Sequence, residues 1–141
     1  MVALKKRLEA GPKAGLPEPF ARWFASRGWR PCAHQLQLLD LAREGRDTLL
    51  IAPTGGGKTL AGFLPSLVDL NLRGAKPQAG IHTLYISPLK ALAVDVQRNL
   101  LGPIEEMGLP IRVETRTGDT PSDRKARQRL PEAILPRLVR E

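Results

Sequence analysis

Cysteine, aromatic residues and long apolar runs are all scarce in this sequence. Cys32 is the only cysteine among 141 residues, which excludes an internal disulfide or a multi-cysteine zinc site and fits a reducing compartment. Aromatic residues make up only 4% of the chain. No apolar stretch approaches the roughly 20 residues that a membrane-spanning helix requires, and residues 8–15 carry charge and proline where a leader peptide would be apolar. We therefore expect a cytoplasmic protein with no membrane partner.

A marked excess of positive charge accompanies these absences. The chain has 22 Lys and Arg against 14 Asp and Glu, a net charge of +8 and a pI near 10.4. This balance predicts attraction to polyanions, with nucleic acid first among them. The length suits one hydrophobic core and no second complete domain. We expect a loose arm over residues 1–15, one domain over residues 16–129 and an atypical tail over residues 130–141.

Residues 47–59 read D-T-L-L-I-A-P-T-G-G-G-K-T, and the rest of the chain is organised around them. The apolar run 48–51 is typical of a strand buried on both faces. The three glycines and Lys58 then predict a tight loop and a helix start. Glycines let backbone N–H groups close around phosphate oxygens, and the helix N-terminus adds positive partial charge. The run matches G-x-x-x-x-G-K-[ST] except that Ala52 stands at the first glycine.

We interpret this loop as a site for ATP and Mg²⁺. Its candidate cofactor-binding residues are Thr54, Gly55, Gly56, Gly57, Lys58 and Thr59. Lys58 would reach the β- and γ-phosphates and the Thr59 hydroxyl would hold Mg²⁺, so these two are also the candidate catalytic residues. Gln35 precedes the loop, where its amide could pair with the N6 and N7 edge of adenine. The alternatives are a bare glycine turn with an exposed lysine, and a plain surface glutamine.

Apolar periodicity along the chain predicts an α/β fold. Helices are expected at residues 17–28, 36–45 and 60–72, with another that begins at about residue 87. Short apolar segments at 48–51, 81–86 and 110–115 predict three strands. Strand, helix and strand in succession predict a right-handed βαβ unit. We therefore expect a short parallel sheet flanked by helices.

Two further segments follow expected strands at the same rim of that sheet. S-P-L-K-A-L at 87–92 opens a helix whose N-terminus would seat a nucleic-acid phosphate, although an ordinary strand-to-helix turn explains the spacing equally well. The second segment begins at Arg116 and runs into a basic stretch, S-D-R-K-A-R-Q-R, at 122–129. The candidate phosphate contacts in these segments are Lys90, Arg116, Arg124, Lys125 and Arg127.

Four motifs, W-R-P-C-A-H-Q, A-P-T-G-G-G-K-T, I-S-P-L-K-A-L and T-R-T-G-D-T-P, resemble the first motifs of superfamily 2 helicases in order and spacing. The resemblance is greatest to the large helicase-related (Lhr) group, especially its ligase-associated DEXH-box DNA helicases, and covers residues 16–129. It implies an incomplete P-loop (RecA-like) domain of an ATP-dependent DNA helicase with a role in DNA repair. Alanine commonly begins the phosphate loop in this group, which accounts for Ala52.

The resemblance also implies roles for individual residues. Gln35 would read adenine, and Thr54 to Thr59 would hold the triphosphate and Mg²⁺. The residues implied to contact the backbone of the tracking strand, with Arg116 beside them, are Pro88, Leu89, Lys90, Arg116, Thr117, Gly118 and Asp119. Contacts of this kind position a strand without reading its sequence.

The chain departs from the family after residue 129. In the family a T-P-E motif, a D-E-x-H motif and a second RecA-like domain with arginine fingers follow, and these 141 residues contain none of them. We therefore expect an N-terminal fragment, from a truncated or frame-shifted gene, that binds ATP but hydrolyses it inefficiently.

The expected partners are DNA, as a single strand or a duplex junction, with RNA as an alternative, and a DNA ligase or nuclease by family resemblance. The alternative function is a non-catalytic nucleotide- or nucleic-acid-binding module. A small-molecule P-loop kinase is disfavoured because S-P-L-K-A-L and T-G-D have no role there.

Overall fold

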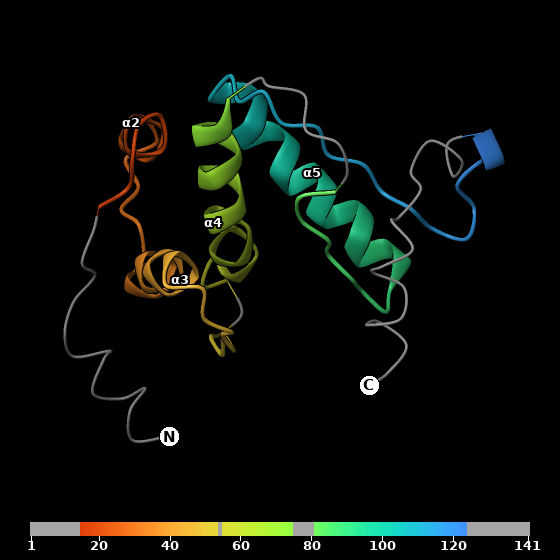
Figure 1. Ribbon diagram of the computed structural model, residues 1–141, viewed down its shortest axis with the longest axis horizontal. Coiled ribbons are helices and arrows are strands. Elements are labelled where there is room, and N and C mark those ends of the chain that lie inside the picture. The colour runs from red at the N-terminus through yellow and green to blue at the C-terminus, as the bar shows by residue number, and fades with distance from the viewer. Residues whose placement is uncertain (1–14, 54, 75–80, 124–141) are drawn as a thin grey trace.

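The computed structural model describes residues 15–53, 55–74 and 81–123 (Figure 1). Within these ranges the chain forms four helices: α2 (Phe20–Ser26), α3 (Ala33–Arg43), α4 (Lys58–Arg73) and α5 (Lys90–Glu106). The four expected helices are thus confirmed, with bounds that differ by a few residues. The expected arm, apart from Gly15, and the expected tail lie outside the described residues, as does most of the basic stretch, with Arg124, Lys125 and Arg127.

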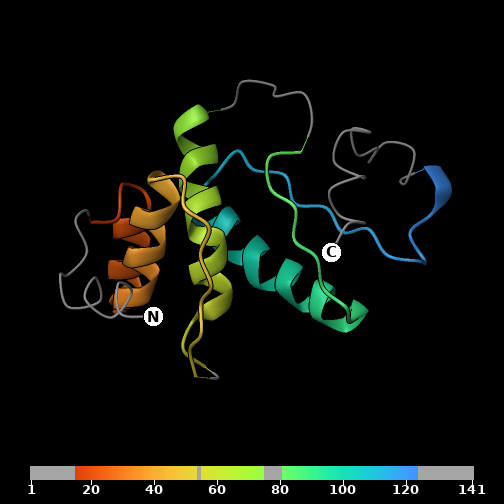
Figure 2. The same ribbon diagram turned by 60° about the horizontal axis from the view of Figure 1, so that its bottom comes forward.

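Helix α4 lies at the centre of the arrangement. Ala61, Leu64, Leu67 and Val68 recur at helical spacing and are all buried, so one apolar stripe drives its packing. Figure 2 shows α3 beside α4, and Figure 1 shows the C-terminal end of α5 near the C-terminal half of α4, with α5 diverging from α4 toward residue 90. None of the helices in the described ranges is long and apolar enough to span a bilayer.

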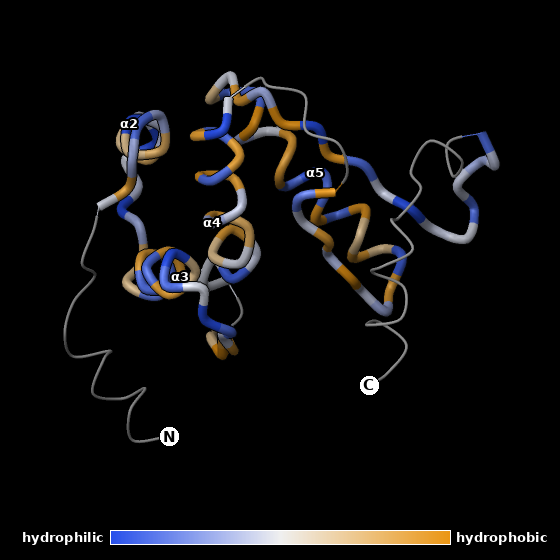
Figure 3. Tube along the Cα trace, in the orientation of Figure 1, coloured by the Kyte–Doolittle hydropathy of each residue, from blue (hydrophilic) through white to orange (hydrophobic). Residues whose placement is uncertain are grey.

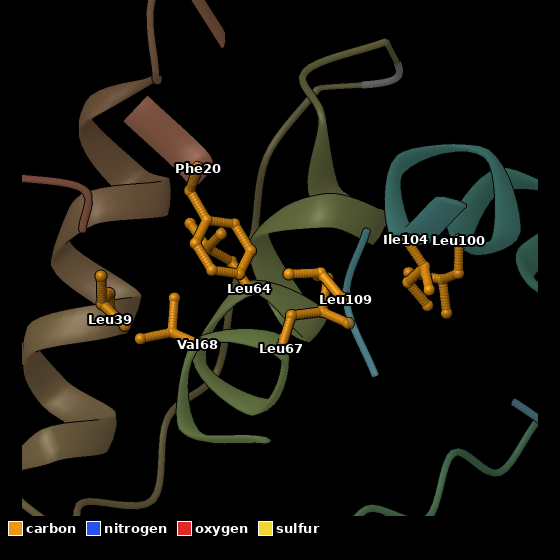
Figure 4. Close-up of a cluster of buried hydrophobic side chains, with 8 residues drawn as sticks. All are labelled: Phe20, Leu39, Leu64, Leu67, Val68, Leu100, Ile104 and Leu109. Atoms are coloured by element: carbon orange, nitrogen blue, oxygen red, sulfur yellow. The ribbon is translucent and has the colours of Figure 1, made fainter. Parts of the chain in front are cut away.

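The hydrophobic core joins all four helices (Figure 4). Its buried members are Phe20, Leu39, Leu64, Leu67, Val68, Leu100, Ile104 and Leu109. Full burial of one such side chain stabilises the folded state by about 1.5 to 3 kcal/mol. Because these residues come from separate helices and from the turn after α5, the core fixes how the helices lie relative to one another.

The predicted parallel sheet is wrong for the residues that the structure describes. The three segments expected as strands, 48–51, 81–86 and 110–115, are coil in the described ranges, and with them the expected βαβ unit is absent. Leu49 is 78% exposed, Ile51 85% and Ile86 63%, whereas a strand of a parallel sheet is covered on both faces. The apolar colour in Figure 3 accordingly continues along segments that run outside the helices.

The physical reason is that a strand needs a partner, and apolar patterning does not supply one. Parallel ladders bond each strand to neighbours that lie beside it, and small sheets are marginal in water. Of the three segments, the third is the one that packs against the core: Ile111 and Val113 contact it while Arg112 and Glu114 point outward. That alternation has the period of a strand, but the segment meets a helical core in place of another strand.

A small polar network holds the second expected strand against α4. His82 Nε2 lies 2.6 Å from an Asp69 carboxylate oxygen, and Arg73 pairs with the same carboxylate at 2.7 Å. The hydrogen bond from His82, and then the one from Arg73, lower the pKa of Asp69 below its ordinary value. The ring of Tyr85 lies 5.4 Å from that of Phe63 on α4. Residues 82–85 therefore run along α4, from Asp69 in its second half to Phe63 in its first half, next to the glycine loop.

Candidate functional site

The glycine loop enters α4 through residues in the left-handed region. Gly55 has φ of 80° and Gly57 has φ of 68°, values that cost a residue with a Cβ atom about 1 to 2 kcal/mol. Gly57 is the N-cap of α4, and its carbonyl accepts the first helical bond, from the N–H of Ala61 at 2.9 Å. The N–H groups of the first turn have no carbonyl partner inside a helix. They are therefore available to an anion at this end of α4.

Lys58 folds back over the loop that precedes it. Its ammonium donates hydrogen bonds to the carbonyl oxygens of Ala52 at 2.8 Å and Pro53 at 2.7 Å. The side chain is exposed, so no burial cost keeps it from exchanging these carbonyls for other oxygens. The structure thus places one positive charge beside the free amides of the helix N-terminus, which is the electrostatic setting that binds phosphate.

Gln35 lies against the same loop and is only 4% exposed. Its side-chain oxygen accepts a hydrogen bond from the Cys32 N–H at 2.9 Å, and its amide donates to the Gly57 carbonyl at 3.4 Å. A Cβ at Gly57 would come within 2.8 Å of the same amide nitrogen. Both polar ends of Gln35 therefore have internal partners, and its reading of adenine stays a prediction.

A cavity of about 330 Å³ opens beside the loop, between α4, residues 83–85 and α5. Lys58 and Thr59 line its polar side, and Phe63, Tyr85 and Val96 line its apolar side. The Thr59 hydroxyl stands on the exposed first turn of α4, and oxygen is the ligand that Mg²⁺ prefers. The described lining includes no carboxylate, so Thr59 fits Mg²⁺ only together with the oxygens of a bound phosphate. Thr54 lies outside the described residues.

The two segments expected to contact nucleic acid meet at one surface. Lys90, the first residue of α5, forms an ion pair with Asp119. Asp119 belongs to a tight turn in which the Thr117 N–H donates to the Thr120 hydroxyl at 2.8 Å and the Thr120 N–H to the Thr117 carbonyl at 3.2 Å. Pro88, Leu89, Arg116 and Gly118 are exposed around this pair. We call this the Lys90–Asp119 surface.

Sequence reasoning placed Lys90 and Asp119 at a common rim but did not foresee that they pair with each other. It also assigned no role to Trp29 itself. Trp29, however, is 51% exposed and lies beside Arg27. The sequence did carry a signal for this exposure. Trp29 follows the end of a helix and lies in the run R-G-W-R, where few apolar residues can pack against it.

One prediction concerns the backbone of the loop. Gly57→Ala should destabilise the fold by about 1 kcal/mol or more, because alanine meets the left-handed penalty and forces the Gln35 amide to move. Urea unfolding measures the change. Gly102→Ala is the matched control, since it lies inside α5 with open space around its Cβ and should stabilise the chain by about 0.5 to 1 kcal/mol. Equal effects of the two substitutions would contradict the loop geometry.

Comparison with known families gives a direct match. Residues 32–138 match the family described as DEAD/DEAH box helicase. The match includes the glycine loop, the cavity and the Lys90–Asp119 surface.

Individual relatives point to one group within that family. The chain is 44% identical to a Lhr helicase/probable uracil glycosylase of Mycolicibacterium smegmatis over 73% of its own length and 8% of the relative's. It is 39% identical to the Lhr helicase/uracil glycosylase of Escherichia coli over 88% of its length and 9% of the relative's. It is 36% identical to the ATP-dependent helicase Lhr-Core of Methanocaldococcus jannaschii over 79% of its length and 15% of the relative's. The chain thus spans a small part of these relatives. No solved structure matches it significantly.

Proposed function

Because the chain belongs to the DEAD/DEAH box helicase family, we propose that it binds Mg·ATP at the glycine loop and DNA at the Lys90–Asp119 surface. The proposal gives it the nucleotide-binding part of an ATP-dependent DNA helicase of the Lhr type, with slow hydrolysis by this chain alone. A cytoplasmic location, a role in DNA repair and association with a ligase or nuclease belong to the same proposal.

The observation that carries the ATP proposal is the position of the Lys58 ammonium. It lies 2.7 and 2.8 Å from two loop carbonyls at the N-terminus of α4. Phosphate oxygens carry more negative charge than these carbonyl oxygens. They would also accept hydrogen bonds from the free N–H groups of the first turn of α4. A triphosphate would therefore draw Lys58 from Ala52 and Pro53, while Thr59 would supply one oxygen to Mg²⁺. The metal would neutralise phosphate charge there.

The observation that supports the DNA proposal is the convergence of two segments on one surface. Lys90 stands at the N-terminus of a 17-residue helix and contacts the turn at Asp119. Both side chains are largely exposed, at 59% and 75%, so the pair contributes little to stability. A phosphate group can replace the Asp119 carboxylate on Lys90 at small cost. Such a contact would bind the backbone and not the bases, so binding should be indifferent to sequence.

We expect nucleic-acid binding to weaken steeply with salt. For a single strand, each neutralised phosphate contributes about −0.7 to the slope of log K against log salt. Lys90→Gln should therefore flatten the slope by about 0.7, while Arg43→Gln, a control on α3 whose arginine pairs with Asp40, should leave it unchanged. Anisotropy titrations of labelled DNA and RNA strands measure both slopes. Tight binding that does not change with salt would contradict the proposal. Tighter binding of RNA than of DNA would make RNA the proposed ligand in place of DNA.

A further inference from the structure

A cluster of aromatic and charged side chains joins the end of α2 and the turn after it to the end of α5. The guanidinium of Arg27 lies over two indole rings, 5.2 Å from the centroid of Trp23 and 5.1 Å from that of Trp29. The two indoles meet edge to face at 5.7 Å. Glu106, the last residue of α5, accepts hydrogen bonds from Trp23 Nε1 at 2.6 Å and from Arg27. The cluster ties α2 and the turn after it to the end of α5.

These contacts hold Trp29 in place while leaving much of it open. Trp23 is only 7% exposed, but Trp29 is 51% exposed. The Trp29 N–H bonds to the carbonyl of Phe24 at 2.9 Å, which fixes the backbone beneath the ring. The hydrogen bonds between Arg27 and Glu106 raise the pKa of the arginine and lower that of the glutamate, as expected for a charged pair in direct contact. The indole is thus braced on one side by a guanidinium that cannot swing away freely.

We propose that Trp29 is a stacking platform for one base of a single-stranded nucleic acid, with the neighbouring Arg30 holding the adjoining phosphate. The inference rests on the proposed function in that it assumes nucleic-acid binding, but it adds a contact within the W-R-P-C-A-H-Q segment, where the resemblance gives a role only to Gln35. Base stacking on an aromatic face is tolerant of sequence and is worth about tenfold or more in affinity per base. An indole already ordered by its neighbours loses little conformational freedom when a base stacks on it.

The charges near Trp29 favour nucleic acid over other ligands that could bind the exposed indole. Glu106 neutralises Arg27, so Arg27 serves as a brace and not as an electrostatic attractor. Arg30 is exposed and makes no hydrogen bond or ion pair among the described residues, and the chain as a whole carries +8. A single strand offers both a π-face for Trp29 and a phosphate one step away for Arg30. An apolar peptide would leave Arg30 without a partner.

The test uses the full chain with a fluorescein-labelled oligothymidylate and an abasic strand of equal length. Trp29→Ala should weaken binding of oligothymidylate about tenfold and leave binding of the abasic strand unchanged, whereas Trp29→Phe should restore most of the affinity. Leu72→Ala is the matched control, since Leu72 is an apolar side chain 71% exposed on α4, and it should change neither. Arg30→Gln should weaken binding of both strands and reduce the slope of log K against log salt by about 0.7.

A measurement on the unaltered chain covers the case in which Trp29→Ala does not fold. Oligothymidylate should quench the tryptophan emission to saturation, and the abasic strand should not. Absence of quenching, or an equal loss of affinity for both strands in Trp29→Ala, would overturn the platform. If the strands bind with the expected dependence on salt and Lys90 but ignore Trp29, only this inference fails. If the chain binds no strand at all, the proposed DNA-binding function fails with it.

Discussion

Lys58→Ala should lose most of the affinity for Mg·ATP. The ammonium is the charged group among the described residues that line the cavity beside the glycine loop, and the loop amides are dipoles of much smaller charge. A hydrogen bond to a charged group is worth about 1.5 to 3 kcal/mol, which is roughly tenfold to a hundredfold or more in Kd. Isothermal calorimetry with Mg·ATP measures the difference between the two chains directly.

A matched control exists on the next helix. Lys90 is also an exposed lysine in the first turn of a helix, but it pairs with Asp119 and lies outside the glycine loop. Lys90→Ala should bind Mg·ATP as the unaltered chain does while losing affinity for DNA. Equal affinity for ATP in the unaltered chain and in Lys58→Ala would remove the loop from the nucleotide site and leave the DNA proposal standing on its own.

The helices were predictable because their signals are local. Phe20, Trp23 and Phe24 recur at the spacing of one helical face, and all three are buried in α2. Gly57 and Lys58 mark the start of α4 through backbone freedom and charge, both of which can be read from the residues alone. The strands were not predictable in the same way. The apolar run 48–51 shows that the segment is suited to burial between neighbours, but it carries no information about whether neighbours are present.

The same distinction between local and long-range signals applies to the residues of the candidate site. Lys58 and Thr59 stand where the loop pattern predicted, since a glycine turn and a helix start fix both positions. The partners of Gln35 depend on how α3 packs against the loop, and the structure gives it the Cys32 amide and the Gly57 carbonyl. The pairing of Lys90 with Asp119 joins residues 29 positions apart in sequence through a turn whose direction no local pattern specifies. Long-range pairing is the part that sequence patterns leave open.

Turnover of ATP by this chain should be far below that of a complete phosphoryl-transfer site. The described residues that line the cavity beside Lys58 include no carboxylate to orient a water and no arginine to meet the charge of the transferring phosphate. Absence of an arginine finger alone costs roughly 10³ to 10⁵ in rate. We therefore expect phosphate release slower than about 10⁻² s⁻¹, the order of magnitude of a P-loop GTPase that carries its own arginine in the site. Addition of single-stranded DNA should not raise it.

Phosphate release by Lys58→Ala separates slow turnover by this chain from contamination. A residual rate that is the same in both chains belongs to a contaminating ATPase, because the substitution removes the ammonium that would hold the phosphates. A rate that DNA stimulates and that Lys58→Ala abolishes would contradict the prediction. It would mean that residues outside the described lining complete the site, and that binding of a strand at the Lys90–Asp119 surface reaches the phosphates through α5 and the cavity wall at Val96. The expected rate is slow and independent of DNA, whereas the contradicting rate rises with DNA. One titration of DNA at saturating ATP therefore distinguishes them.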